Sequence, residues 1–315
     1  MHLGKLISPA ISSLHTVTRS INSVAVIGSG LMGSGIAQVS AQAGLKVHLI
    51  DKNEEILKKS TVTIKRNLGL VAKKKFKDDA SAQEAFVSNS LANLVTSTDM
   101  IKASKDSDLI IEAVIENLEI KHEIFKSLDA SLPAPCMLAS NTSSLLIKEI
   151  AKVVQRKDRI IGLHFFNPVP VMKLVEVVKT DEVSQVTQEK IMAYCKAIGK
   201  TPVICRDTPG FIVNRLLIPN LMEAMRLYER GDASFQDIDV AMKLGAGHPM
   251  GPFELADYVG LDTALFIIQG WHKNYPNNTS FEPPKILIDL CSQGKYGRKS
   301  GEGFYKYDAV GNKVH

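Results

Sequence analysis

The feature that most constrains the fold is a glycine-rich turn between an apolar run and a helix-like stretch. Residues 23–27 (SVAVI) are branched and apolar, as in a buried parallel strand. They lead into GSGLMG at residues 28–33, and the helix-like stretch 34–43 follows. A second strand-like run, residues 46–50, ends at Asp51, 18 residues past the last glycine. This order of strand, glycine turn, helix and acid predicts a dinucleotide site.

Each part of the turn has a physical reason. Gly28 permits a tight turn, Gly30 lets the backbone approach a pyrophosphate, and Gly33 lets helix and strand pack closely. The helix N-terminus offers N–H groups and a positive dipole end to phosphates. Asp51 can accept hydrogen bonds from ribose hydroxyls and would repel a 2′-phosphate, so NAD is predicted rather than NADP. The predicted cofactor residues of this segment are Gly28, Ser29, Gly30, Leu31, Met32, Gly33 and Asp51.

Composition excludes several other classes of protein. The 315 residues are 45% hydrophobic and 23% charged, which is ordinary for a globular chain and excludes a disordered or collagen-like one. No run approaches the ~18 apolar residues of a membrane span. The four cysteines have no zinc spacing, so no metal is predicted. A net charge of +5 is too small to indicate nucleic-acid binding by itself.

Residues 1–22 differ from the rest of the chain. They hold Lys5, Arg19, six Ser or Thr and no acid, and the first acidic residue of the chain is Asp51. A basic, Ser-rich and acid-poor segment is typical of an organellar transit peptide, while an unstructured leader with no targeting role is the alternative. We expect the ordered fold to begin near Ser23 and the mature protein to lie in the mitochondrial matrix.

The pattern of elements predicts two domains. Strand-like runs alternate with helical patterns, which predicts an α/β fold with a Rossmann-like, doubly wound and mostly parallel sheet in residues 23–206. The runs are 108–114, 137–140, 160–165, 173–178 and 201–205. Past the turn at 207–210 the strand pattern fades, and amphipathic stretches predict a smaller all-helical domain in residues 207–315.

A histidine and a carboxylate twelve residues apart suggest acid–base chemistry. His164 precedes a turn fixed by Pro168 and Pro170, and the chain returns through the apolar run that holds Glu176. A carboxylate on an apolar strand face needs a partner, and a hairpin-like return could place it beside the histidine. An imidazole held by a carboxylate near a nicotinamide suits a general base for alcohol oxidation. A structural core histidine is the alternative interpretation.

A run of basic residues follows the second strand. Residues 56–77 contain eight lysines or arginines and no acid. Such a run usually marks a solvated helix face, but it also suits a docking surface for a phosphorylated ligand. Both interpretations hold if only one or two of the lysines touch the ligand.

Taken together, the segments closely resemble the L-3-hydroxyacyl-CoA dehydrogenases of fatty-acid β-oxidation, the short-chain mitochondrial type. The resemblance runs from Ser23 to Tyr307. Its most specific carriers are HFFNPVPVMKLVE and DTPGFIVNR. The others are SVAVIGSGLMGSGIAQ, ASNTSSL, YERGDAS, KLGAGHPMGPFELADYVGLD and GEGFYKY.

The resemblance implies a role for each matching residue. His164 would be the catalytic base and Glu176 its partner, while Ser143 and Asn214 would hold the substrate oxygen. Further NAD contacts would come from Glu116, Lys121, Ser143, Asn167 and Lys299. Coenzyme A contacts would come from Lys74, Ser143 and Asn67, which stands where relatives have a serine. The helical domain would also form a homodimer, and the substrate would be an acyl-CoA.

The expected activity is NAD-dependent oxidation of (S)-3-hydroxyacyl-CoA to 3-oxoacyl-CoA. Two alternatives share the architecture. One is a related NAD-dependent 3-hydroxy-acid or sugar-acid dehydrogenase, which gives no reason for the basic run. The other is a catalytically idle, crystallin-like relative, in which the His164–Glu176 pair would be eroded, whereas both residues are present.

Overall fold

The computed structural model describes residues 20–133 and 135–314, which form two compact units. The predicted leader, residues 1–22, lies almost wholly outside the described residues. Ile21 is already buried in the core of the first unit, and the Asn22 amide donates to the Asp108 carboxylate. The ordered fold therefore includes two residues before the Ser23 start that the sequence predicts.

The first unit is built on an eight-stranded sheet of order β3-β2-β1-β4-β5-β6-β7-β8. Five neighbouring pairs, from β3 to β6, are parallel, and β7 runs antiparallel to β6. The strands are β1 (Ser23–Ile27), β2 (Lys46–Ile50), β3 (Leu94–Ser97), β4 (Leu109–Glu112), β5 (Met137–Ser140), β6 (Ile160–Phe165), β7 (Leu174–Lys179) and β8 (Thr201–Arg206). This order contains the 3-2-1-4-5-6 arrangement of doubly wound dinucleotide-binding sheets, so the predicted fold class is confirmed.

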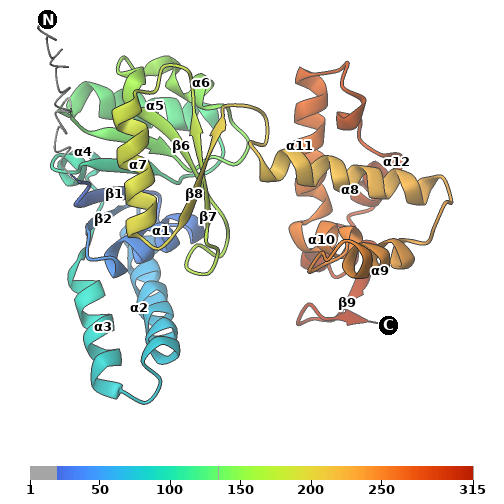
Figure 1. Cartoon of the computed structure of the whole chain (residues 1–315), viewed down its shortest axis with the longest axis horizontal. Coiled ribbons are helices and arrows are strands. Elements are labelled where there is room, and N and C mark those ends of the chain that lie inside the picture. Colours follow the sequence, from blue (N-terminus) through green and yellow to red (C-terminus); the bar gives the residue numbers. More distant parts are fainter. Residues whose placement is uncertain (1–19, 134, 315) are drawn as a thin grey trace, which may run out of the picture. The chain divides into compact units, whose positions relative to one another are not determined.

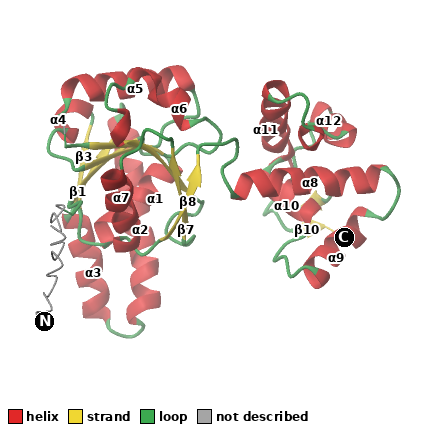
Figure 2. Cartoon of the chain, turned by 45° about the horizontal axis from the view of Figure 1, so that its top comes forward, coloured by secondary structure: helices red, strands yellow, loops and turns green. Residues whose placement is uncertain are grey.

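Helices cover both faces of this sheet (Figure 2). On one face α1 (Leu31–Gln42) and α7 (Gln185–Ala197) share a core with the sheet, and the Ser40 and Tyr194 hydroxyls meet there at 2.8 Å. The other face carries α4 (Met100–Ser104) and α5 (Leu118–Ser131). Because both faces are covered, β1, β4 and β5 are almost continuously apolar and buried.

Two long helices, α2 (Glu54–Phe76) and α3 (Ala80–Ala92), lie side by side and extend beyond the sheet (Figure 1). Helix α2 ends at Phe76, and Lys73, Lys74 and Lys75 in its last turn interact favourably with the negative end of the helix dipole. The sequence did not predict α3 or the strand β3 that follows it. Strand β3 is a four-residue edge strand with no buried residue, so it has no apolar pattern to detect.

The second unit is predominantly helical. Its helices are α6 (Ile147–Ile150), α8 (Val213–Glu229), α9 (Phe235–Gly245), α10 (Pro252–Val259), α11 (Leu261–Asn274) and α12 (Lys285–Ser292). Leu221 and Met225 of α8 are buried in its core, and the Ser234 side chain caps α9. A short hairpin of β9 (Lys306–Tyr307) and β10 (Lys313–Val314) corrects the prediction that this part is entirely helical.

The two units interleave in the chain. Residues 142–150 group with the second unit, which otherwise begins at Ile204. Asp207 links the two segments of this unit: its carboxylate accepts hydrogen bonds from the amides of Ile147 and Lys148, both at 2.8 Å. It therefore caps α6 across about 60 residues of sequence, a pairing that no local pattern predicts.

Candidate active site

Strands β6 and β7 bring the predicted histidine and carboxylate together. The two strands are antiparallel, and their register places His164 directly opposite Glu176. The distance from His164 Nδ1 to Glu176 Oε2 is 2.7 Å, and both side chains are buried. The predicted hairpin return is confirmed, because residues that face each other across antiparallel strands have adjacent side chains.

This contact fixes how the imidazole can act. A fully buried carboxylate is costly without a hydrogen-bond donor, and the ring supplies one. Because Nδ1 is engaged by Glu176, the exchange of a proton with another molecule falls to Nε2. The Phe166 ring lies 4.4 Å from the His164 ring, centroid to centroid, and further restricts its orientation. Glu176 and Phe166 thus fix the position of the His164 ring.

The glycine turn lies where β1 ends beside β4, the point at which the strand order reverses. Gly28 has φ +96°, and a Cβ there would lie 2.6 Å from the Ala113 carbonyl oxygen. A Cβ on Gly33 would overlap the carbonyl of Gly28. Gly28 and Gly33 are thus required by the protein's own backbone.

Gly30 differs from these two glycines. A Cβ there would meet no described atom within 4 Å, although Gly30 is the N-cap of α1. The neighbouring Leu31 is 72% exposed. The open space lies at the N-terminus of a twelve-residue helix with no acid in its first turn, and a dinucleotide phosphate fits there.

Asp51, at the end of β2, is held against this turn. Its Oδ2 accepts hydrogen bonds from the Ser29 amide at 2.8 Å and the Ser29 hydroxyl at 2.9 Å. The Ser29 carbonyl in turn accepts from the hydroxyls of Ser34 and Ser60. The carboxylate is therefore fixed beside the glycine turn with Oδ1 available to ribose hydroxyls, which fits NAD.

A buried ion pair that the sequence did not reveal lies at the ends of β4 and β5. Glu112 accepts from Lys121 at 2.7 Å, from the Ser140 hydroxyl at 2.6 Å and from the Val114 amide at 2.8 Å. Glu112, Lys121 and Ser140 are fully buried. Lys121 also lies 3.3 Å from Glu116, which is partly exposed. Of the two predicted cofactor residues, Lys121 is held by Glu112, which the sequence did not reveal, and Glu116 pairs with Lys121.

Asn167 and Asn67 line one groove of about 310 Å³ in the first unit. Three segments line it: the glycine turn with the start of α1, helix α2, which carries Asn67, and the turn between β6 and β7, which carries Asn167. The groove therefore brings together two residues predicted to contact different ligands.

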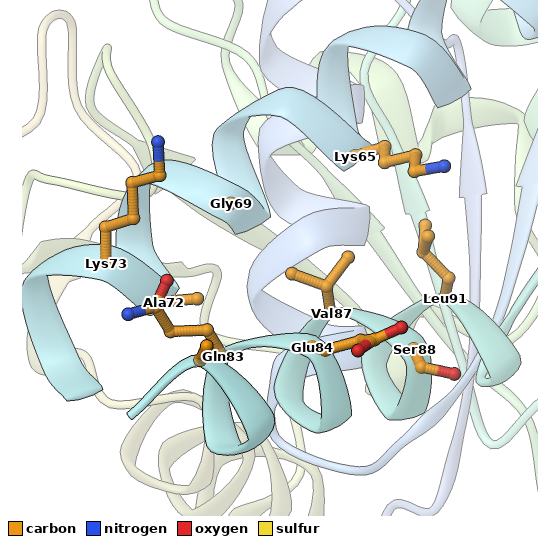
Figure 3. A pocket seen from close by; sticks show the side chains of 10 residues that line it. Lys65, Gly69, Ala72, Lys73, Gln83, Glu84, Val87, Ser88 and Leu91 are labelled. Atoms are coloured by element: carbon orange, nitrogen blue, oxygen red, sulfur yellow. The ribbon is translucent and has the colours of Figure 1, made fainter. Parts of the chain in front are cut away.

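The basic run divides between two faces of α2. Lys74 lies two turns beyond Asn67, on the same face of the helix. Lys65 and Lys73 instead line a separate groove of about 490 Å³ between α2 and α3, with Gln83, Glu84 and Ser88 on its other side (Figure 3). Only part of the basic run thus shares a face with Asn67.

The other predicted site residues belong to the second unit. Ser143 is exposed in the segment before α6, and Asn214 lies in the first turn of α8. Lys299 Nζ forms an ion pair with Asp262 Oδ1 at 2.6 Å.

Two further observations concern the described residues as a whole. Within residues 20–133 and 135–314, no group of three or more His, Cys, Asp or Glu is suited to a metal ion. None of the helices in the same ranges combines the length and apolar character needed to span a bilayer.

Comparison with protein families gives matches along nearly the whole folded chain. A model described as the NAD binding domain of 3-hydroxyacyl-CoA dehydrogenase matches residues 23–208. A second, described as the C-terminal domain of the same enzyme, matches residues 210–307.

Similar proteins are named accordingly. The mitochondrial hydroxyacyl-coenzyme A dehydrogenase of Homo sapiens is 55% identical over 303 residues, covering 95% of this chain and 96% of that protein. A probable 3-hydroxybutyryl-CoA dehydrogenase of Bacillus subtilis is 41% identical over 288 residues, covering 91% of this chain and 98% of the relative. The crystal structure of (S)-3-hydroxybutyryl-CoA dehydrogenase from Ralstonia eutropha matches with a TM-score of 0.87 and 38% identity, covering 92% of this chain and all of that one.

Proposed function

The chain belongs to the 3-hydroxyacyl-CoA dehydrogenase family, and we propose that it performs NAD-dependent oxidation of 3-hydroxyacyl-CoA through a His164–Glu176 dyad. The observation that carries the proposal is the 2.7 Å contact between these buried side chains. The proposed substrate has the (S) configuration, and the proposed role of the activity is in fatty-acid β-oxidation. An assay of NADH oxidation against acetoacetyl-CoA and longer 3-oxoacyl-CoAs tests it, and no turnover of any of these thioesters would reject it.

The dyad does the acid–base part of the reaction. His164 Nε2 takes the proton of the substrate hydroxyl as the C–H bond breaks and the carbonyl forms. Glu176 keeps Nδ1 engaged and stabilises the imidazolium that results. When bound, NAD supplies the acceptor for the hydride. In the reverse direction the imidazolium returns the proton to the oxygen of the 3-oxoacyl group.

We assign the remaining residues by their match to the family. Ser143 and Asn214 hold the substrate oxygen while the proton moves. The cofactor is held by the glycine turn from Gly28 to Gly33 and by Asp51, with further contacts from Glu116, Lys121, Ser143, Asn167 and Lys299. The buried Glu112 supports this set, since it fixes Lys121 and through it Glu116. Residues 23–206 then form the NAD-binding domain and residues 207–315 the substrate and dimerisation domain.

Coenzyme A is bound by Asn67, Lys74 and Ser143. Lys74→Ala should raise KM for a CoA ester roughly 3- to 10-fold, because an exposed ion pair with phosphate is lost. KM for the matching N-acetylcysteamine thioester, which has no phosphate, should stay unchanged. Steady-state kinetics on both thioesters measure this.

Lys73→Ala is the matched control, since that lysine lies one residue away but lines the groove between α2 and α3. It should leave both KM values unchanged. An equal effect of Lys74→Ala on the two thioesters would remove the assignment.

The second unit forms a homodimer. It carries large apolar side chains on its surface, among them Leu216, Leu244 and Phe266, each more than two-thirds exposed. Covering such side chains with a second copy of the chain would remove apolar surface from water, which stabilises a dimer. Phe266→Glu should convert the dimer to a monomer, as measured by light scattering after gel filtration.

Val186→Glu, on an exposed residue of α7 in the first unit, is the control and should remain dimeric. A dimeric Phe266→Glu variant would place the interface elsewhere, and a monomeric wild type would exclude it.

The protein acts in the mitochondrial matrix. The acid-free, Ser-rich residues 1–22 support this, as does the mitochondrial designation of the Homo sapiens relative. Import of the full chain into isolated mitochondria, with protease protection of the product after removal of the outer membrane, tests the location. A chain without residues 1–22 should not be imported.

A further inference from the structure

The ammonium of the buried Lys200 donates hydrogen bonds to main-chain carbonyls. The residue lies between α7 and β8 and is only 8% exposed. Its Nζ donates to the Val169 carbonyl and, at 2.7 Å, to the Met172 carbonyl. No carboxylate of the described residues forms an ion pair with it, and burial lowers the pKa of the ammonium. A buried charge without a counter-ion is destabilising unless hydrogen bonds compensate for its lost hydration, and here two backbone carbonyls supply them.

The Lys200 ammonium stabilises the turn from Asn167 to Lys173, which joins β6 to β7. Inside the turn, the amides of Val171 and Met172 both donate to the Pro168 carbonyl. At its end, the Thr201 amide donates to the Lys173 carbonyl at 2.8 Å. The Lys200 ammonium thus bridges two carbonyls near the middle of the turn, and its neighbour Thr201 holds the end.

Helix α1 packs against the same turn. A Cβ on Gly35 would lie 2.7 Å from Cβ of Val169, which is buried. Gly35 and Lys200 therefore both hold Val169, the first by close packing against its side chain and the second by a hydrogen bond to its carbonyl. Val169 and its neighbours Asn167, Pro168 and Pro170 form one wall of the 310 Å³ groove above the glycine turn.

The contact between His164 and Glu176 is held by strand pairing and not by this turn. His164 and Glu176 face each other within the paired strands β6 and β7, and strand pairing extends on both sides of them. A movement of the turn would change the groove wall and the direction of the Asn167 side chain. It would leave the 2.7 Å contact of the dyad in place.

We propose that Lys200 is a positioning residue that fixes the Asn167–Lys173 turn and so sets the shape of the groove that receives the ligands. The inference rests on the proposed function for the identity of those ligands. Its signature is a loss of binding with little loss of the chemical step, because the wall moves and the dyad stays.

Lys200→Met keeps the length and apolar volume of the side chain but removes the donors. The dissociation constant of NADH, measured by fluorescence titration, and KM for acetoacetyl-CoA should both rise about 10-fold, the loss expected for charge-assisted hydrogen bonds. The value of kcat should stay within about 3-fold of wild type. Lys200→Arg, which keeps a cation with several donors, should restore both binding values to within about 3-fold.

The control is Lys196→Met, at an exposed lysine in the last turn of α7, four residues before Lys200, and it should match the wild type. Hydrogen exchange gives a second readout: in Lys200→Met the amides of Val171 and Met172 should exchange faster, while those of β6 and β7 should not. A drop in kcat with unchanged NADH binding, or no change at all, would overturn the proposal.

Should Lys200→Met fail to fold, Gly35→Ala tests the same turn through its contact with α1. Its Cβ would press on Val169, and the expected result is again weaker NADH binding at nearly constant kcat. Loss of kcat alone in this variant would count against the role of the turn. Because NADH titration needs no turnover, a wild type inactive on 3-oxoacyl-CoAs would reject the proposed function and leave this test intact.

Discussion

Replacing His164 with glutamine should lower kcat by at least about 10²-fold, the usual contribution of a positioned general base. Glutamine fills similar space and can still donate a hydrogen bond to Glu176, so the buried carboxylate keeps a partner. The amide cannot take the substrate proton. NADH binding should be unchanged, because the residue acts on the proton and not on the cofactor. Steady-state kinetics with acetoacetyl-CoA and a fluorescence titration with NADH measure the two effects.

Glu176→Gln is the companion variant. It leaves a hydrogen-bonding partner for Nδ1 but removes the negative charge that stabilises the imidazolium. The double variant should be about as impaired as His164→Gln alone, since two residues that act as a unit are strongly non-additive. Near-normal turnover in His164→Gln would remove the catalytic assignment, and additive losses would show that Glu176 acts independently of the histidine.

The dyad could be predicted because its geometry follows from local sequence. A histidine at one strand end, a proline-fixed turn and a carboxylate on an apolar strand allow few arrangements, and antiparallel pairing supplies the contact. The glycine turn was predictable for the same reason, since strand, turn and helix are consecutive. Both features are built from segments shorter than 30 residues.

The same physical argument applies to Glu112. Glu112 lies within the strand-like run 108–114 and is the last residue of β4, and a carboxylate there needs a partner as much as Glu176 does. Its partners could not be named in advance. Ser140 lies 28 residues away on the neighbouring strand, and Lys121 comes from α5. The strand order brings them together, and strand order is not a local property of the sequence.

The hydrogen-bond partners of Asn141 and Lys200 were beyond prediction for a related reason. The Asn141 side chain accepts a hydrogen bond from the Phe165 amide at 3.0 Å and so joins the end of β5 to β6, beside His164. Lys200 reaches carbonyls about 30 residues earlier in the chain. Asparagine after a strand and lysine after a helix are ordinary surface residues by pattern alone. Only the burial of these side chains, seen in the folded chain, distinguishes them.

Gly30→Ala should weaken NADH binding about 10- to 100-fold while leaving the fold intact. The backbone there has φ −64° and ψ −167°, which alanine adopts without strain, and the added Cβ meets no described atom within 4 Å. The free protein should therefore lose no more than about 1 kcal/mol, the usual difference between glycine and alanine at a helix N-cap. The bound cofactor has no such freedom, because the methyl group would occupy the space through which the backbone approaches the pyrophosphate.

Gly33→Ala separates this effect from a general loss of stability. Its Cβ would overlap the Gly28 carbonyl, so that variant should lower the melting temperature and weaken NADH binding together. Thermal unfolding and NADH titration of the two variants measure both quantities. If Gly30→Ala binds NADH like the wild type, the phosphates lie elsewhere; if it unfolds like Gly33→Ala, the space at Gly30 is closed in the folded protein. Weak binding in a stable Gly30→Ala variant would mean that the space above Gly30 is reserved for the ligand, whereas Gly28 and Gly33 serve the backbone.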